Sequence, residues 1–180
     1  MILLCDSREQ ASLMLDFPKQ AGITVERRGL PTGDYACLHD WNGQVVLDPV
    51  VCERKSISDL FTSFTGNYEA EKAKLVKAQT LGLSYVLAIE VNATEIIRGH
   101  TYWAGGELRE SQKSGVAMLR QLFSLCRRHG VVLWFCSSRT EMAFRLQEFF
   151  LAWERMENPP LAGPEAQRAF GIGTTEDACV

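Results

Sequence analysis

Three residues in the first third of the chain have types and spacing suited to metal-assisted hydrolysis: Asp34, Glu53 and Lys55. Glu53 and Lys55 lie two positions apart in an apolar, strand-like run, so their side chains share one face while Arg54 points to the other. A carboxylate from Asp34, on a neighbouring strand, would complete a pair of oxygen ligands suited to Mg²⁺ or Mn²⁺. Such an ion polarises a phosphodiester and activates water, and a nearby lysine orients that water or offsets negative charge. The set predicts metal-dependent phosphodiester hydrolysis.

A simpler interpretation exists for each of the charged residues taken alone. Glu53 and Lys55 by themselves would suit an exposed ion pair at a sheet edge, which contributes little to stability. Asp59 follows Ser56 by three positions, where a carboxylate favours a helix N-terminus by about 0.3–1 kcal/mol in any protein. Glu9 could likewise be a charge in the first turn of a helix. Only the combination of several acids at strand ends favours a catalytic site.

Short apolar runs predict the strands that position these residues: 1–5, 23–27, 34–38, 45–47, 50–55, 85–91 and 131–136. Turn residues favour antiparallel pairing over 23–55, whereas 85–91 is apolar except for Glu90, as a buried parallel strand between helices is. Helical periodicity and caps predict helices at 7–18, 56–64, 68–81, 92–98, 110–129 and 138–156, with a loop at 99–109. This order predicts an α/β fold with helices on both faces of a mixed central sheet. One domain is expected over 1–157, followed by a flexible tail over 158–180, where the periodicity ends.

The composition is that of a soluble globular protein and excludes several other classes. The net charge of −3 argues mildly against a nucleic-acid binder, although a local basic cluster or bound divalent cations would offset it. The six cysteines form no CxxC pair and the three histidines lie far apart, so no zinc-ligand spacing is present. We expect reduced cysteines in an intracellular protein without a signal peptide or a membrane span.

A longer motif surrounds the three chemical residues. It consists of Asp6-Ser7-Arg8-Glu9, then Gly33-Asp34, then Glu53-Arg54-Lys55 and, after three further residues, Asp59. Over roughly residues 1–155 the chain resembles the XPF-type structure-specific nuclease domains of the PD-(D/E)xK, restriction-endonuclease-like superfamily. The signature of that family is GD, then ERK, three residues and Asp. A chance match to the whole run is remote.

The resemblance implies a role for each matching residue. Asp34 and Glu53 would bind Mg²⁺ or Mn²⁺, with Glu9 as a further candidate metal ligand, and Lys55 would support the attacking water. The other motif residues would be supporting acids or accompanying basic groups: Asp6, Asp59, Arg8 and Arg54. Gly33 would let the backbone come close to the metal or the phosphate.

Two departures from the family pattern stand out. Relatives carry Gly-Arg shortly after the last motif aspartate, and then a glutamine, whereas this chain reads Gly66-Asn67-Tyr68-Glu69. Lys72 or Lys74 could replace the missing arginine, although their pattern on the helix also suits a plain solvated surface. The tandem helix-hairpin-helix domains of eukaryotic and archaeal relatives have no signature here. We therefore expect a stand-alone version in the cytoplasm of a bacterium or phage-infected cell, or in the nucleus if the source is eukaryotic.

The resemblance also implies substrates and partners. The expected activity is endonuclease cleavage of branched, flapped or single-strand-containing DNA, and the alternative is a non-catalytic DNA-binding or scaffold partner with the same fold. The complete motif favours the enzyme. The last helix carries more apolar residues, such as Phe144 and Phe149, than one buried face requires, which suits a homodimer or a recruiting protein as well as a core helix. Tyr102 and Trp103 could stack on a base or pack against the core.

Overall fold

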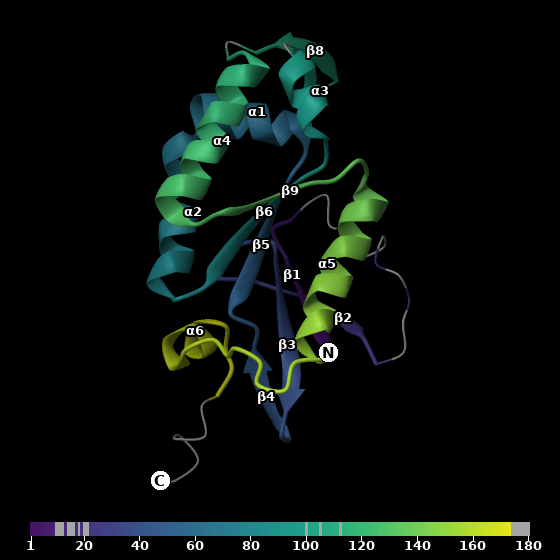
Figure 1. Ribbon diagram of the computed structural model, residues 1–180, viewed down its shortest axis with the longest axis vertical. Coiled ribbons are helices and arrows are strands. Elements are labelled where there is room, and N and C mark those ends of the chain that lie inside the picture. Colours follow the sequence, from purple (N-terminus) through teal and green to yellow (C-terminus); the bar gives the residue numbers. More distant parts are fainter. Residues whose placement is uncertain are drawn as a thin grey trace.

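The computed structural model describes residues 1–9, 13, 17, 19, 22–99, 101–104, 106–111 and 113–173, except for the side chains of 102–104. Most of the helix predicted at 7–18 lies outside the described residues. The remaining elements form a twisted central sheet with helices packed on it, and the N-terminus lies near one end of α5 (Figure 1). The predicted fold class, a mixed sheet with helices on both faces, is confirmed.

Within the described residues, seven strands form one sheet in the order β2-β1-β3-β5-β6-β9, with β4 paired to β3 outside this path. Their bounds are β1 Ile2–Asp6, β2 Thr24–Arg28, β3 Tyr35–Trp41, β4 Gln44–Leu47, β5 Val50–Lys55, β6 Ser84–Ile89 and β9 Val132–Phe135. β3 runs antiparallel to β1, β4 and β5, whereas β5, β6 and β9 are mutually parallel. This sheet brings the start of β3 beside the ends of β1 and β5.

The antiparallel prediction for the second strand was wrong. β2 pairs parallel to β1, with Ile2 opposite Thr24 and Asp6 opposite Arg28. Parallel neighbours need a crossover of a dozen or more residues, and residues 7–23 supply one. A turn-based interpretation misses this because the pairing partner of a strand is set by the long connection before it.

Helices cover both faces of the sheet. Their bounds are α1 Ile57–Gly66, α2 Tyr68–Thr80, α3 Ala93–Arg98, α4 Gly115–His129, α5 Arg139–Trp153 and α6 Pro164–Ala169. Side chains of α1, α2, α4 and α6 pack with Leu4, Val51 and Leu87 in one core cluster. Side chains of α5 pack with Leu3 and Cys52 in the other. Adjacent residues of one strand thus enter opposite cores, as the period of two requires.

Residues 99–110 differ from the sequence prediction of a loop and a helix start. β7 Thr101–Ala104 and β8 Glu107–Glu110 form an antiparallel hairpin, and α4 begins only at Gly115, where Ser114 caps it by accepting from the Ala117 amide. A Cβ at Gly115 would lie 1.7 Å from the Ile96 carbonyl oxygen. The helix therefore starts where a side chain is not tolerated, because α3 and α4 touch there.

Residues 159–173 are folded against the sheet and do not form the flexible tail that the sequence predicted from residue 158. α5 ends at Trp153 rather than at Met156, and the Trp153 indole donates to the Pro160 carbonyl at 2.9 Å. The chain then returns to the sheet, where Ala162, Ala166, Phe170 and Ile172 are buried, and α6 lies beside β4 (Figure 1). Four buried positions are too few to give a clear helical period. Residues 174–180 lie outside the described residues.

Across the part of the chain that the structure describes, no helix combines the length and the apolar character needed to cross a lipid bilayer.

Candidate active site

Asp34 is held at the point where β3 and β5 meet. The register pairs Tyr35 with Cys52, and the Asp34 amide donates to the Cys52 carbonyl at 2.8 Å. The Arg54 amide in turn donates to Asp34 Oδ2 at 2.8 Å. Gly33 has φ +74°, and a Cβ there would lie 3.3 Å from the Cys52 carbonyl oxygen. Glycine suits this turn because a side chain there would crowd Cys52 and strain the backbone, and the predicted approach of Gly33 to a metal or a phosphate stays a prediction.

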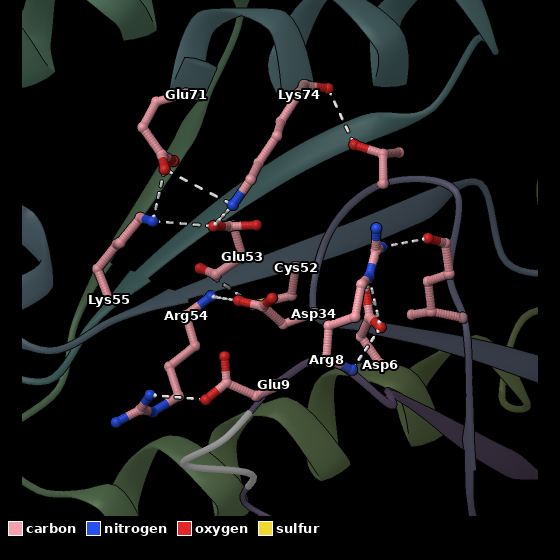
Figure 2. A network of polar contacts seen from close by, with 12 residues as sticks. Asp6, Arg8, Glu9, Asp34, Cys52, Glu53, Arg54, Lys55, Glu71 and Lys74 are labelled. Carbon is pink, nitrogen blue, oxygen red and sulfur yellow. Dashed lines mark hydrogen bonds and ion pairs between the residues drawn. The ribbon is translucent and has the colours of Figure 1, made fainter. Parts of the chain in front are cut away.

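Glu53 and Lys55 face the same side of β5, as the strand period predicts (Figure 2). Glu53 is 1% exposed, and its Oε1 accepts from Lys74 Nζ at 2.5 Å and lies 3.0 Å from Lys55 Nζ. Lys55 Nζ also donates to Glu71 Oε1 at 2.8 Å. The second oxygen, Glu53 Oε2, is buried without a hydrogen-bond partner in the described structure. This face of β5 therefore carries a charged cluster with an unused acceptor.

Arg54 faces the opposite side, and each nitrogen of its guanidinium donates a hydrogen bond. Its Nε and Nη2 donate to the two carboxylate oxygens of Glu90, each at 2.8 Å, and its Nη1 donates to Glu9 Oε1 at 3.1 Å. Arg139 lies 3.5 Å from Glu90 as well. Bidentate pairing of this kind is the geometry in which a buried guanidinium is most stable. Arg54 thus ties β5 to the loop after β1 and to the end of β6.

The two carboxylates near the start of β3 influence each other. Burial raises the pKa of Asp34 to about 8, and repulsion from Glu53 acts in the same direction. Burial alone would lower the pKa of Lys55, but Glu53 and Glu71 outweigh it and hold this pKa above its usual value. Lys55 is therefore an ammonium at neutral pH and can donate hydrogen bonds but cannot act as a base.

A pocket of about 530 Å³ opens over this cluster. The residues that line it come from the ends of β1 and β5, the loop before β3, and α1 and α2: Asp6, Arg8, Glu9, Pro31, Thr32, Gly33, Asp34, Glu53, Arg54, Lys55, Asp59, Ser63 and Lys74. It contains every motif residue to which the resemblance assigns a role. It is far more polar than a typical small-molecule site.

Asp6 and Asp59 lie in the wall of the pocket, each with a local partner. The buried Asp6 carboxylate accepts from Arg8 Nε at 3.0 Å and from Arg8 Nη2 at 2.5 Å. Burial raises the pKa of Asp6, but these bonds more than offset it and hold it below its usual value. Asp59 is bonded to Ser56, which caps α1. Asp6 therefore orients the exposed Arg8 at the rim, and Asp59 serves as the first-turn acid that the simpler interpretation describes.

The oxygen atoms of Asp34 and Glu53 fit a divalent cation. Glu53 Oε2 is a buried acceptor with nothing bound to it, and the repulsion between the two carboxylates would be relieved by positive charge between them. Within the described residues, no group of three or more His, Cys, Asp or Glu side chains is arranged to hold a metal ion. Glu9 contacts Arg54 instead, so its role as a third ligand stays a prediction.

Two residues of this cluster were not assigned to the site from the sequence. Glu71 binds Lys55, and Lys74 binds Glu53, although the pattern of α2 suited a solvated surface. Their spacing of three positions puts both on one helix face, and that was the available signal. Which face of α2 meets β5 is decided by tertiary packing. Tyr102 and Trp103, for which base stacking and core packing were both open, lie in β7, and their side chains are outside the described part.

Comparison with known protein families shows which family the chain belongs to. The ERCC4 domain family matches residues 5–149, which is most of the chain. The chain belongs to the ERCC4 domain family. This confirms the resemblance to the XPF-type nuclease domains that the motif predicts.

Solved structures agree with this ERCC4 assignment. XPF from Aeropyrum pernix in complex with DNA is similar with a TM-score of 0.57 and 18% identity, over 87% of this chain and 67% of that one. A second structure of XPF from the same organism gives a TM-score of 0.55 and 18% identity, over 86% of this chain and 69% of that one. At this identity the likeness establishes the fold. No curated protein sequence matches the chain.

Proposed function

We propose that the protein is a Mg²⁺- or Mn²⁺-dependent DNA endonuclease with its active site at Asp34, Glu53 and Lys55. The observation that carries the proposal is the convergence of the half-buried Asp34, the buried Glu53 and a protonated lysine in one open polar pocket of an ERCC4-type domain. Among the described residues Glu53 Oε2 is a buried carboxylate oxygen without a hydrogen-bond partner, and a metal ion bound there would satisfy it.

Each residue has a task that its position supports. Asp34 and Glu53 would hold the metal, which when bound polarises the phosphodiester and lowers the pKa of a bound water. Lys55 lines the pocket as an ammonium, so it would orient the attacking water or offset the charge of the phosphate oxygens. Arg8 is 69% exposed at the rim of the pocket, where its guanidinium can reach a DNA phosphate while Asp6 fixes its orientation.

DNA with branches, flaps or single-strand ends is the proposed substrate class. The support is the family and the related Aeropyrum pernix XPF, which was solved in complex with DNA. An open polar pocket also suits a phosphodiester backbone better than an apolar small molecule. With a net charge of −3, we expect weak and strongly salt-dependent DNA binding.

A panel of labelled flap, fork, single-stranded and duplex DNA tests the activity with Mg²⁺, Mn²⁺ or EDTA. We expect metal-dependent cleavage that Glu53→Gln lowers by at least about 1000-fold, because the metal loses one of its two carboxylates. Lys72→Met, on the outer face of α2, serves as the control. No cleavage with any metal, together with DNA binding by the wild type and by Glu53→Gln alike, would favour the non-catalytic scaffold instead.

We propose in addition that a second copy of the chain covers the apolar surface beside β9. Four large apolar side chains are exposed there, on α4, β9 and α5: Phe123 (52%), Val132 (45%), Phe144 (53%) and Phe149 (37%). β9 is also an edge strand of the sheet. Sedimentation equilibrium of the wild type and Phe144→Asp tests this proposal. A dimer that the substitution dissociates supports it, and a wild-type monomer at high concentration contradicts it.

A further inference from the structure

Both the backbone and the side chain of Lys74 make contacts that hold it over the candidate active site. The Thr32 hydroxyl donates to the Lys74 carbonyl at 2.9 Å, which ties α2 to the loop that precedes Gly33 and Asp34. From this anchored position Lys74 Nζ reaches Glu53 Oε1 at 2.5 Å and Glu71 Oε1 at 3.6 Å (Figure 2). An unconstrained surface lysine would not be fixed to the same loop that holds Asp34.

The two lysines that contact Glu53 differ in how freely they can move. The side chain of Lys55 is 8% exposed and donates to Glu71 as well, so both its position and its charge are fixed. The side chain of Lys74 is 41% exposed and lines the open pocket. Its ammonium, on a flexible four-carbon stem, can leave Glu53 for another anion in the pocket while Lys55 stays beside Glu53.

Resting on the proposed nuclease function, we propose that Lys74 is a tethered cation that neutralises Glu53 in the metal-free protein. When a divalent cation binds to Asp34 and Glu53, Lys74 turns to the phosphate of the bound DNA. Lys74 thus competes with the metal before substrate binds and contacts the substrate afterwards.

The chain provides a closely matched control. Lys72 lies on the same helix, its side chain is 42% exposed, and it pairs with Glu69 rather than with Glu53. Lys72→Met and Lys74→Met therefore make the same change in net charge and in helix sequence. Only Lys74→Met removes a cation from Glu53.

The first experiment measures Mn²⁺ binding by calorimetry on the full chain without DNA. We expect Lys74→Met to bind Mn²⁺ about three- to fivefold more tightly than the wild type, as loss of a partly exposed competing ion pair implies. Lys72→Met should bind it as the wild type does. Lys74→Gln repeats the test with a polar side chain, and circular dichroism confirms that each variant is folded.

The second experiment measures binding of flap DNA in Ca²⁺, which supports binding without cleavage, at several salt concentrations. For Lys74→Met the slope of log K against log [salt] should become shallower by about 1, the loss of one phosphate contact. An unchanged Mn²⁺ affinity and an unchanged slope in Lys74→Met would overturn the inference while leaving the nuclease intact. A wild type that neither binds Mn²⁺ nor cleaves DNA would instead overturn the proposed function, and this inference with it.

Discussion

The two faces of β5 carry buried charges in opposite states. On one face, Arg54 donates two hydrogen bonds to the Glu90 carboxylate and a third to Glu9. On the other, Glu53 keeps one oxygen unbonded in the described structure and repels Asp34, whose pKa burial raises to about 8. Residues adjacent in sequence are thus satisfied on one side and unsatisfied on the other.

This difference suggests that the two faces of β5 have different roles, one in stability and one in function. A buried ion pair with all its hydrogen bonds made holds elements together, and removing one partner is costly. Buried carboxylates forced close together are unfavourable by themselves, and the fold tolerates them where a ligand relieves them. We therefore interpret the Arg54 face as the part that holds β5 in place and the Glu53 face as the part that binds metal and substrate.

Arg54→Met should have the largest effect on stability of any change in this region. It removes the guanidinium that donates to the largely buried Glu90 and Glu9 carboxylates, and breaking a buried ion pair costs about 3–5 kcal/mol. Urea unfolding followed by circular dichroism measures the loss. Arg139→Met, which removes the half-exposed second partner of Glu90, is the control and should cost less than about 1 kcal/mol. A small effect of Arg54→Met would break the assignment of that face to stability.

Lys55→Met should act mainly on catalysis. We expect cleavage to fall about 100- to 1000-fold at saturating Mg²⁺, because the pocket loses its fixed hydrogen-bond donor. Single-turnover rates on flap DNA measure this effect. Lys55→Arg keeps the charge with a different shape and should recover part of the rate. A Lys55→Met enzyme with a near-normal rate would show that the ammonium on this face is structural.

Glu9→Gln should have the smallest effect. Glu9 accepts one hydrogen bond from Arg54, and glutamine can still accept it, so we expect a stability loss of about 1 kcal/mol. Cleavage should fall less than tenfold. A loss of cleavage rate of 100-fold or more, together with weaker Mn²⁺ binding, would instead make Glu9 a metal ligand, as the motif suggests. Glu9 would then act with Glu53 and Asp34 rather than with Arg54.

The sequence predicted the fold class and the local geometry of β5 better than it predicted the pairing of distant segments. The period of two on β5 correctly separated Glu53 and Lys55 from Arg54, because that separation is a local property of a strand. Local patterns could not reveal that β2 runs parallel to β1, nor that Phe170 and Ile172 pack on the sheet. Both depend on contacts between segments distant in the chain. The placement of Lys74 at Glu53 was missed for the same reason.

The pH dependence of stability follows from the burial of Asp34. Its pKa is about 8 in the folded protein against 3.8 ordinarily, so between these values the folded protein keeps a proton that the unfolded chain has released. Stability of the metal-free protein therefore falls as the pH rises through this window. The side-chain amide of an Asp34→Asn variant would not titrate, and its oxygen could still accept the hydrogen bond from the Arg54 backbone amide.

The most direct test measures unfolding and cleavage together for Asp34→Asn and the wild type. In EDTA, the stability advantage of Asp34→Asn should grow from about pH 5 to about pH 8.5 and reach a few kcal/mol, on the order that the pKa difference allows. In Mg²⁺, its cleavage of flap DNA should be lost. A variant that gains no stability at the upper end of this pH range, or that still cleaves at close to the wild-type rate, would contradict the assignment of this face of β5 to metal binding.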